Sequence, residues 1–165
     1  MDRSISAFAH LTEAAIPGAA TDMDLPGAGA AGGLGFAFHT YLHGTLTAGA
    51  PLVLRYTGIE RELVDTDVLI TGEGCLDAQT AMGKAPAVLA ARAKELNPRC
   101  LTLALAGTCT KGADALNEQC IDAYFPILSA PMARTSAMAP AETKKNLSRT
   151  SAQLLRLIHG VTQAP

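Results

Sequence analysis

Carboxylates, glycines and one lysine gather in the segment from Thr71 to Lys84, directly after an apolar run and directly before a helical pattern. Two acidic side chains, Glu73 and Asp77, can hold a substrate hydroxyl or a magnesium ion, which prefers oxygen ligands. Lys84 adds a mobile positive charge of the kind that accompanies phosphates, and the helix start behind it favours an anion. The segment is therefore predicted to bind a small, oxygen-rich, anionic ligand.

The other polar residues and the glycines of this segment fit the same interpretation. Gln79 and Thr80 can donate to phosphate or sugar-like oxygens, and glycine lets the backbone turn sharply and approach a ligand closely. The further candidate binding residues are Thr71, Gly72, Gly74, Gln79 and Thr80. A structural alternative stays open, because Asp77 is also a common turn residue and Thr80 a common residue at helix starts. The segment is not a Walker A motif, since Ala85 follows Lys84.

A second glycine-rich run, "GAGAAGGLG", covers residues 27–35. Gly27, Gly29 and Gly32 formally match the G-x-G-x-x-G pattern of dinucleotide-binding proteins, but no apolar strand precedes them. Close packing of a helix against a loop explains the same glycines equally well, so both interpretations stay open. The candidate substrate- or phosphate-binding residues of this run are Gly29, Gly32 and Gly33.

Histidine and cysteine spacings do not predict a metal centre. His39 and His43 are four residues apart, as metal ligands on a helix can be, but no third ligand follows in a known order. A polar patch on a helix is favoured, and no metal-ligating residue is proposed among the histidines. Four cysteines occur without any C-x-x-C pair, and reduced thiols are expected; they are Cys75, Cys100, Cys109 and Cys120.

Composition excludes several classes of partner. The 165 residues carry a net charge of -2, and only 17% are charged and 4% aromatic, so neither nucleic acid nor an anionic membrane surface is an expected partner. Charged residues follow Met1 directly, without the apolar stretch of a signal peptide. A cytoplasmic protein is expected.

Apolar patterns predict an α/β fold, with a parallel sheet and helices on both of its faces. Strands are expected at 67–71, 100–107 and 123–128, with Pro126 indicating an edge position. Helices are expected at 1–16, within 26–42, and at 85–96, 112–119 and 140–160, where Pro86 occupies a first-turn position and Gly160 follows the last helix. The chain changes character near residue 60. Three strands alone form a thin sheet with exposed edges, which suggests missing structure.

Four stretches together resemble the C-terminal half of the bacterial type-I glycerate kinase family. They are "PGAGAAGGLGFA" (26–37), "DVLITGEGCLDAQTAMGKAP" (67–86), "LALAG" (103–107) and "IDAYFPIL" (121–128). The resemblance implies phosphorylation of D-glycerate to 2-phosphoglycerate with ATP and Mg²⁺. It also implies a two-domain fold, in which residues 1–61 are the tail of an inserted α/β domain and residues 62–165 the returning segment of a Rossmann-like domain.

The resemblance also implies roles for single residues. Glu73 and Asp77 would hold substrate hydroxyls or Mg²⁺, and Lys84 a phosphate or the glycerate carboxylate, while the glycines of 29–35 would let a second domain close over the ligand. Two departures stand out. The family's N-terminal motifs are absent, so the chain alone is expected to be inactive, and Cys75 stands where the family usually has arginine. One alternative is a non-catalytic remnant or interaction module that self-associates through an open sheet edge. Another is a different small-molecule kinase or an anion-binding domain.

Overall fold

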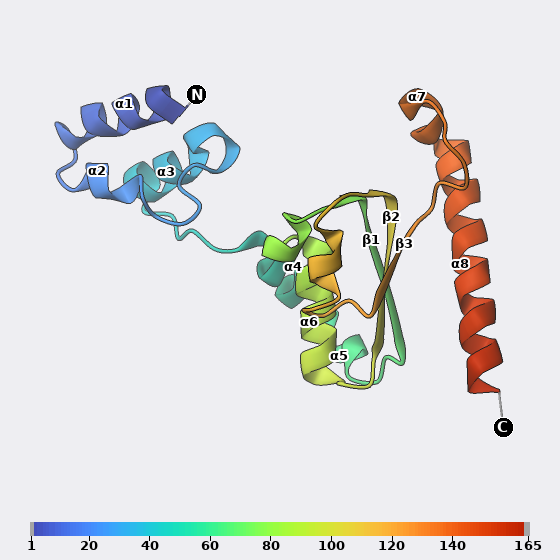
Figure 1. The fold of residues 1–165 in the computed structure, drawn as a ribbon. Coiled ribbons are helices and arrows are strands. Elements are labelled where there is room, and N and C mark those ends of the chain that lie inside the picture. The colour runs from blue at the N-terminus through green and yellow to red at the C-terminus, as the bar shows by residue number, and fades with distance from the viewer. Residues whose placement is uncertain (1, 164–165) are drawn as a thin grey trace. The chain divides into compact units, whose positions relative to one another are not determined.

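The computed structural model describes residues 2–163, which fold into two compact units that divide after Leu52 (Figure 1). The assignment of residues 1–61 and 62–165 to two domains of a longer protein stays a prediction. Among the described residues, no helix combines the length and the apolar character that a membrane crossing needs.

The first unit is helical and packs small residues around one aromatic ring. Its elements are α1 (Asp2–Glu13), α2 (Ala19–Asp22) and α3 (Ala30–Leu42). Phe36 of α3 is fully buried beside Ala9 of α1, Ala19 of α2 and Ala28, which lies just before α3. The ring of Phe8 packs edge to face against it, with the ring centroids 6.0 Å apart. The first helix ends at Glu13 rather than at residue 16, because the Glu13 carboxylate accepts the N–H groups of Gly18 and Ala20 and so stabilises a turn there.

The second unit is a three-stranded sheet with helices. Helix α4 (Gly49–Thr57) spans the division between the units. The elements that follow are α5 (Glu60–Leu63), β1 (Val68–Leu76), η1 (Thr80–Met82), α6 (Ala85–Leu96), β2 (Leu101–Cys109), η2 (Ala113–Leu116), β3 (Ala123–Pro126), α7 (Arg134–Ala137) and α8 (Pro140–Thr162). The strands are parallel in the order β1-β2-β3. The predicted parallel α/β fold is confirmed.

Helices lie on both faces of this sheet, as predicted. Ala104 and Ala106 of β2 pack against alanines of α6. Leu105, which alternates with them and therefore points to the opposite face, packs with Leu154 of α8. Figure 1 shows α6 and α8 on opposite sides of the sheet. Small side chains let α6 approach the strands closely, which explains why the sequence is rich in alanine there.

Several element ends differ from the sequence prediction. Strand β1 continues to Leu76 rather than ending at Thr71, because Glu73 and Cys75 still pair with Ala106 and Thr108 of β2. The segment 71–84 is thus a strand end followed by a turn, not a loop throughout. Helix α8 continues past Gly160 to Thr162, the helix expected at 112–119 is a short 3-10 turn, and β3 stops at Pro126. Pro126 lies on an edge strand and Pro86 in the first turn of α6, as predicted.

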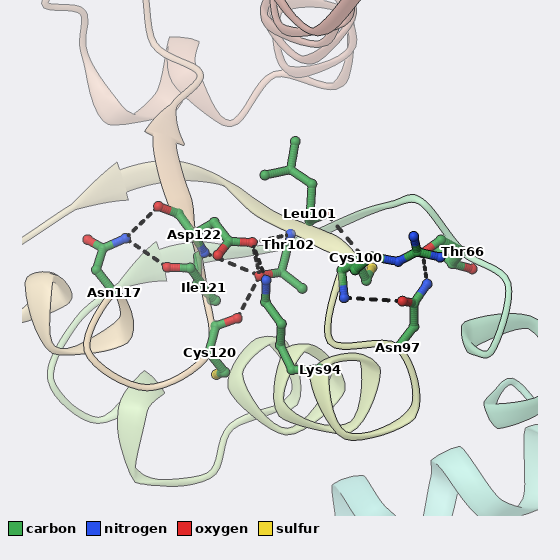
Figure 2. A network of polar contacts seen from close by, with 11 residues as sticks. Thr66, Lys94, Asn97, Cys100, Leu101, Thr102, Asn117, Cys120, Ile121 and Asp122 are labelled. Carbon is green, nitrogen blue, oxygen red and sulfur yellow. Dashed lines mark hydrogen bonds and ion pairs between the residues drawn. The ribbon is translucent and has the colours of Figure 1, made fainter. Parts of the chain in front are cut away.

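A polar network fixes the amino-terminal ends of β2 and β3, far along the strands from the Glu73 end (Figure 2). The Asp122 carboxylate accepts the Thr102 N–H and the Lys94 ammonium, each at 2.7 Å. The buried Thr102 hydroxyl donates to the Cys120 carbonyl at 2.6 Å. Ligands of open α/β sheets bind at the carboxyl ends of strands, so we assign this network to stability.

Candidate functional site

The carboxyl end of β1 carries the first part of the candidate site. Thr71 and Glu73 are half-buried and face Ala104 and Ala106 across the sheet. A Cβ added at Gly72 would lie 2.4 Å from the Leu105 carbonyl oxygen. Glycine at 72 is therefore required by the neighbouring strand itself.

β1 and β2 also approach each other closely at Gly74 and Gly107. A Cβ added at Gly107 would lie 2.7 Å from the Gly74 carbonyl oxygen, whereas a Cβ at Gly74 would meet nothing within 4 Å. Gly74 therefore has open space beside its Cα. Of Gly72 and Gly74, the two candidate binding glycines that lie on β1, Gly74 is the one that leaves room for a ligand.

Thr80 is the structural centre of the turn that follows. Its side chain is completely buried. The hydroxyl lies 3.2 Å from Asp77 Oδ1 and 3.3 Å from Glu73 Oε2, and it accepts the Asp77 N–H at 3.2 Å. The Thr80 N–H donates to Asp77 Oδ1 at 3.0 Å. Thr80, predicted to donate to a ligand, thus holds the carboxylates of Glu73 and Asp77 in place. Gln79, the other predicted donor, is exposed.

The Lys84 ammonium lies close to both carboxylates, those of Glu73 and Asp77. Its Nζ lies 3.4 Å from Asp77 Oδ1 and 3.6 Å from Glu73 Oε1, and all three side chains are about one-third exposed, at 31–35%. Lys84 directly precedes α6, so the positive end of that helix dipole lies beside the cluster. The structure therefore brings together the three residues predicted as catalytic and leaves them accessible to a ligand.

Charge in this cluster is fixed by mutual contacts. The pKa of the Asp77 carboxyl is lowered: partial burial raises it, but the Thr80 N–H, the Lys84 ammonium and the Thr80 hydroxyl together outweigh that influence. The pKa of Lys84 is raised: partial burial lowers it, but Asp77 and then Glu73 outweigh burial. Both groups are consequently charged at neutral pH, and the cluster presents two oxygen ligands next to one ammonium.

A groove lies on the face of the sheet that α8 covers. It encloses about 1160 Å³ between the carboxyl ends of β1 and β2 and the segment from Met132 to Leu147. Thr71, Gly72, Glu73 and Gly74 contribute to its floor, so it borders the strand end that carries Glu73. Sequence reasoning did not identify its other wall. That wall consists of Met132, Arg134, Ala137, Met138, Thr143 and Leu147, and it carries no motif because methionine and leucine there resemble ordinary core residues.

The second glycine run, with Gly29, Gly32 and Gly33, lies in the first unit, whereas the cluster lies in the second. A Cβ added at Gly35 would lie 2.1 Å from the Gly27 carbonyl oxygen. Ala31, Gly32 and Gly33 adopt positive φ angles at the start of α3, a backbone that glycine adopts readily and alanine rarely. The close-packing interpretation accounts for Gly35, and the described elements before this run are the helices α1 and α2.

Metal ligation by histidine receives no support. His39 Nδ1 lies 2.8 Å from the Gly44 carbonyl oxygen, and His39 Nε2 lies 3.8 Å from an Asp22 carboxylate oxygen. Within residues 2–163, no three His, Cys, Asp or Glu side chains are grouped as a metal site would require. Any divalent cation at the cluster must therefore take further ligands from water or from a bound phosphate.

Comparison with known proteins shows which protein family the chain resembles. The model of the glycerate kinase family matches residues 1–159. A glycerate kinase of Bacillus cereus is 40% identical over 129 residues, which cover 75% of this chain and 33% of that protein. A glycerate 2-kinase of Escherichia coli is 33% identical over 130 residues, 78% of this chain and 33% of that protein.

A solved structure shows the same relation. The crystal structure of a Salmonella typhimurium LT2 protein assigned as glycerate kinase 2 superposes with a TM-score of 0.60 and 30% identity, covering 94% of this chain and 39% of that chain. The chain therefore spans about a third of the length of the curated relatives it matches.

Proposed function

Because the chain belongs to the glycerate kinase family, we propose that it carries part of a site for ATP-dependent phosphorylation of D-glycerate to 2-phosphoglycerate. The observation that supports this proposal is the cluster of Glu73, Asp77 and Lys84, held around the buried Thr80 at the carboxyl end of β1. In phosphoryl transfer a protein mainly positions the reactants and stabilises charge. A lysine flanked by two fixed carboxylates is suited to both tasks.

Each residue of the cluster has one task in this proposal. Lys84 binds an anionic group, either a phosphate of ATP or the glycerate carboxylate. Glu73 accepts a hydrogen bond from a glycerate hydroxyl, and Asp77 holds Lys84 charged and in position. Thr80 stays buried and keeps the carboxylates apart from each other but close to Lys84. Gly74 leaves space for the ligand above the strand end.

Magnesium fits the donor set of the cluster. Glu73 and Asp77 offer hard carboxylate oxygens, and Mg²⁺ is commonly bound by one or two carboxylates together with water and substrate phosphates. When bound, Mg²⁺ neutralises charge on the phosphate oxygens.

We do not expect the isolated chain to be active. The chain covers about a third of its relatives, and a reaction that needs two oriented substrates loses most of its rate when the groups that position them are absent. The proposed activity therefore belongs to a longer protein that contains this segment. We place that protein in the cytoplasm, which fractionation of the source cells can check.

The test uses a chimera in which this chain replaces the matched third of the Bacillus cereus relative. ADP release from ATP, Mg²⁺ and D-glycerate is measured, and ³¹P NMR separates 2-phosphoglycerate from 3-phosphoglycerate. We expect activity in the chimera, none in the isolated chain, and a loss of roughly 100-fold in the Lys84→Ala chimera. The matched control is Lys144→Ala, which removes an exposed lysine of α8. Equal activity of the two variants would contradict the role of Lys84.

A folded chimera without glycerate-dependent turnover would contradict the kinase proposal itself. The second candidate function would then gain support, namely a non-catalytic segment that acts by binding another polypeptide. The observation in its favour is the open edge of β1, the end strand of the sheet order. A third outcome, turnover with another hydroxy acid but not with D-glycerate, would change the substrate and keep the reaction.

A further inference from the structure

The groove beside the sheet contains two side chains of opposite charge. Glu73 lies on its floor, at the carboxyl end of β1, and Arg134 lies in the other wall, at the start of α7. The cluster residues Asp77 and Lys84 are not part of the lining. Among the described residues, the rest of the lining consists of apolar side chains, glycines, threonines and Cys75. Arg134 is therefore the cation that this groove offers to a ligand.

The guanidinium of Arg134 is available for such a ligand. Arg134 is exposed, and no carboxylate of residues 2–163 forms an ion pair with it. The other cations of this unit that lie near carboxylates are already engaged. Arg92 is held between Glu60 and Glu95, and Lys84 is paired with both carboxylates of the cluster. An anion in the groove can thus pair with Arg134 without displacing a carboxylate.

The charges of the groove favour a hydroxy acid over a polyphosphate. The single positive charge of Arg134 matches one carboxylate, and its planar guanidinium can donate two parallel hydrogen bonds to a carboxylate group. Glu73 accepts a hydrogen bond from a hydroxyl of the same molecule, but it repels the several negative charges of a polyphosphate. The hydroxyls of Thr71 and Thr108 also line the groove and can bond further ligand oxygens.

We propose that Arg134 binds the carboxylate of the substrate in this groove and selects hydroxy acids over neutral polyols. Glu73 accepts a hydrogen bond from a hydroxyl of the same substrate, and Lys84 is left to bind a phosphate of ATP. The two anionic groups of the reaction are thereby assigned to two different cations. This inference rests on the proposed kinase function and names the residue that recognises the acid.

A pair of ligands tests the role of Arg134 without catalysis. D-glycerate and glycerol have the same number of carbons, but only D-glycerate carries a carboxylate. The isolated chain and the Bacillus cereus chimera are titrated with each compound, and NMR follows the amides of Gly74 and Thr108. We expect D-glycerate, and not glycerol, to shift these signals. Arg134→Gln should weaken the binding of D-glycerate by at least about tenfold.

Two further variants make this measurement specific. Arg156→Gln removes an exposed arginine of α8 that lies outside the groove lining, so it should leave D-glycerate binding unchanged. Arg134→Lys keeps the charge but loses the planar pair of donors, so it should retain only part of the affinity. The melting temperatures of Arg134→Gln and Arg156→Gln should agree, because both side chains are exposed. If Arg134→Gln does not fold, Arg134→Lys replaces it, and unchanged D-glycerate binding in that variant would overturn the inference.

Steady-state kinetics of the chimera test specificity. Arg134→Gln should raise KM for D-glycerate by at least about tenfold and leave KM for ATP nearly unchanged, because the interaction is made with one substrate only. The ratio of kcat/KM for D-glycerate to that for glycerol should fall, since glutamine does not recognise the charge that distinguishes them. A rise in KM for ATP at unchanged KM for D-glycerate would overturn the inference and assign Arg134 to a phosphate.

These outcomes separate the inference from the kinase proposal. A folded but inactive chimera that binds D-glycerate through Arg134 would contradict only the kinase proposal. An active chimera in which Arg134→Gln leaves KM for D-glycerate unchanged would overturn only the role of Arg134. Absence of D-glycerate binding to both the isolated chain and the chimera would also overturn that role.

Discussion

Lys84 Nζ lies 3.4 Å from Asp77 Oδ1, across the turn that joins β1 to α6. The positive charge available to an incoming anion is thus already engaged by a carboxylate. An anionic ligand must compete with Asp77 for the ammonium, or a cation must take over the carboxylate. Ligand binding at this cluster therefore replaces an existing ion pair between Lys84 and Asp77 by a new one. It does not neutralise a charge that was previously unpaired.

The first prediction concerns this pair. Lys84→Met should raise the pKa of Asp77, because it removes one of the contacts that lower it. NMR titration of the Asp77 carboxyl carbon measures the change. Lys144→Met removes an exposed lysine of α8 and serves as the control. An unchanged Asp77 titration in Lys84→Met would show that the ion pair does not persist in solution.

The same pair sets the pH range of its contribution to stability. Since the folded pKa of Asp77 is lowered, its stabilisation exists above the unfolded pKa and is lost as pH falls through the folded value. Since the folded pKa of Lys84 is raised, its stabilisation exists below the unfolded pKa and is lost as pH rises through the folded value. Urea denaturation across pH should therefore show that the free energy of unfolding falls at acid and at alkaline pH. Both decreases should be smaller in Lys84→Met than in the unmodified chain.

The second prediction concerns Thr80, whose hydroxyl is buried between two carboxylates. Thr80→Val keeps the volume but leaves those oxygens without their donor, so it should cost about 1–3 kcal/mol of unfolding free energy. Thr80→Ser keeps the hydroxyl and loses one methyl group, at about 1 kcal/mol. Urea denaturation compares the two. A larger loss for serine than for valine would mean that Thr80 acts by packing alone.

The third prediction concerns Cys75, which lines the groove two residues beyond Glu73. If arginine at this position stabilises developing charge, as the family resemblance implies, Cys75→Arg should raise kcat of the chimera by at least about tenfold. Cys75→Ala provides the control for loss of the thiol. Equal kcat values for all three chimeras would show that position 75 is not part of the charge stabilisation.

The fourth prediction separates two glycines of the first unit. A Cβ at Gly35 would lie 2.1 Å from the Gly27 carbonyl oxygen, whereas a Cβ at Gly29 would meet nothing within 4 Å. Gly29 also has an ordinary φ of -74°. Gly35→Ala should destabilise the first unit by about 2–3 kcal/mol, and Gly29→Ala should change its stability little. Hydrogen exchange within α1 and α3 reports on this unit, and similar effects of both alanines would contradict the close contact.

The fifth prediction concerns the network of Figure 2. Thr102→Val removes the buried hydroxyl that donates to the Cys120 carbonyl, at a cost of about 1–3 kcal/mol. Thr108→Val, on the same strand but exposed, should stay within about 0.5 kcal/mol of the unmodified chain. Thermal unfolding of the isolated chain provides the measurement. Equal losses would assign the effect to β propensity rather than to the network.

The sequence predicted the order of strands and helices well because the signals are local. Apolar runs, Pro86 and Pro126 each act within a few residues. The grouping of Glu73, Asp77 and Lys84 was predictable for the same reason, since a strand end, a turn and a helix start separate them. Their catalytic roles stay predictions.

Non-local contacts explain what the sequence did not predict. The end of β1 depends on pairing with β2, so a motif that resembled a loop became strand as far as Leu76. The burial of Thr80 depends on packing between η1 and η2 and the neighbouring elements, which no local pattern encodes. The groove wall from Met132 to Leu147 meets β1 only in the folded chain, and its apolar side chains carry no signature of position.

The proline at the end of β3 limits how far copies of this chain can add to one another. Fibre growth by strand addition needs two open edges per molecule, one to join and one to pass the template on. Within residues 2–163, β3 offers four residues that end at Pro126, and β1 is the edge strand that offers a long edge. An encounter between two β1 edges consumes both open edges in a symmetric pair. Strand-mediated aggregation therefore stops at two molecules and does not propagate into a filament.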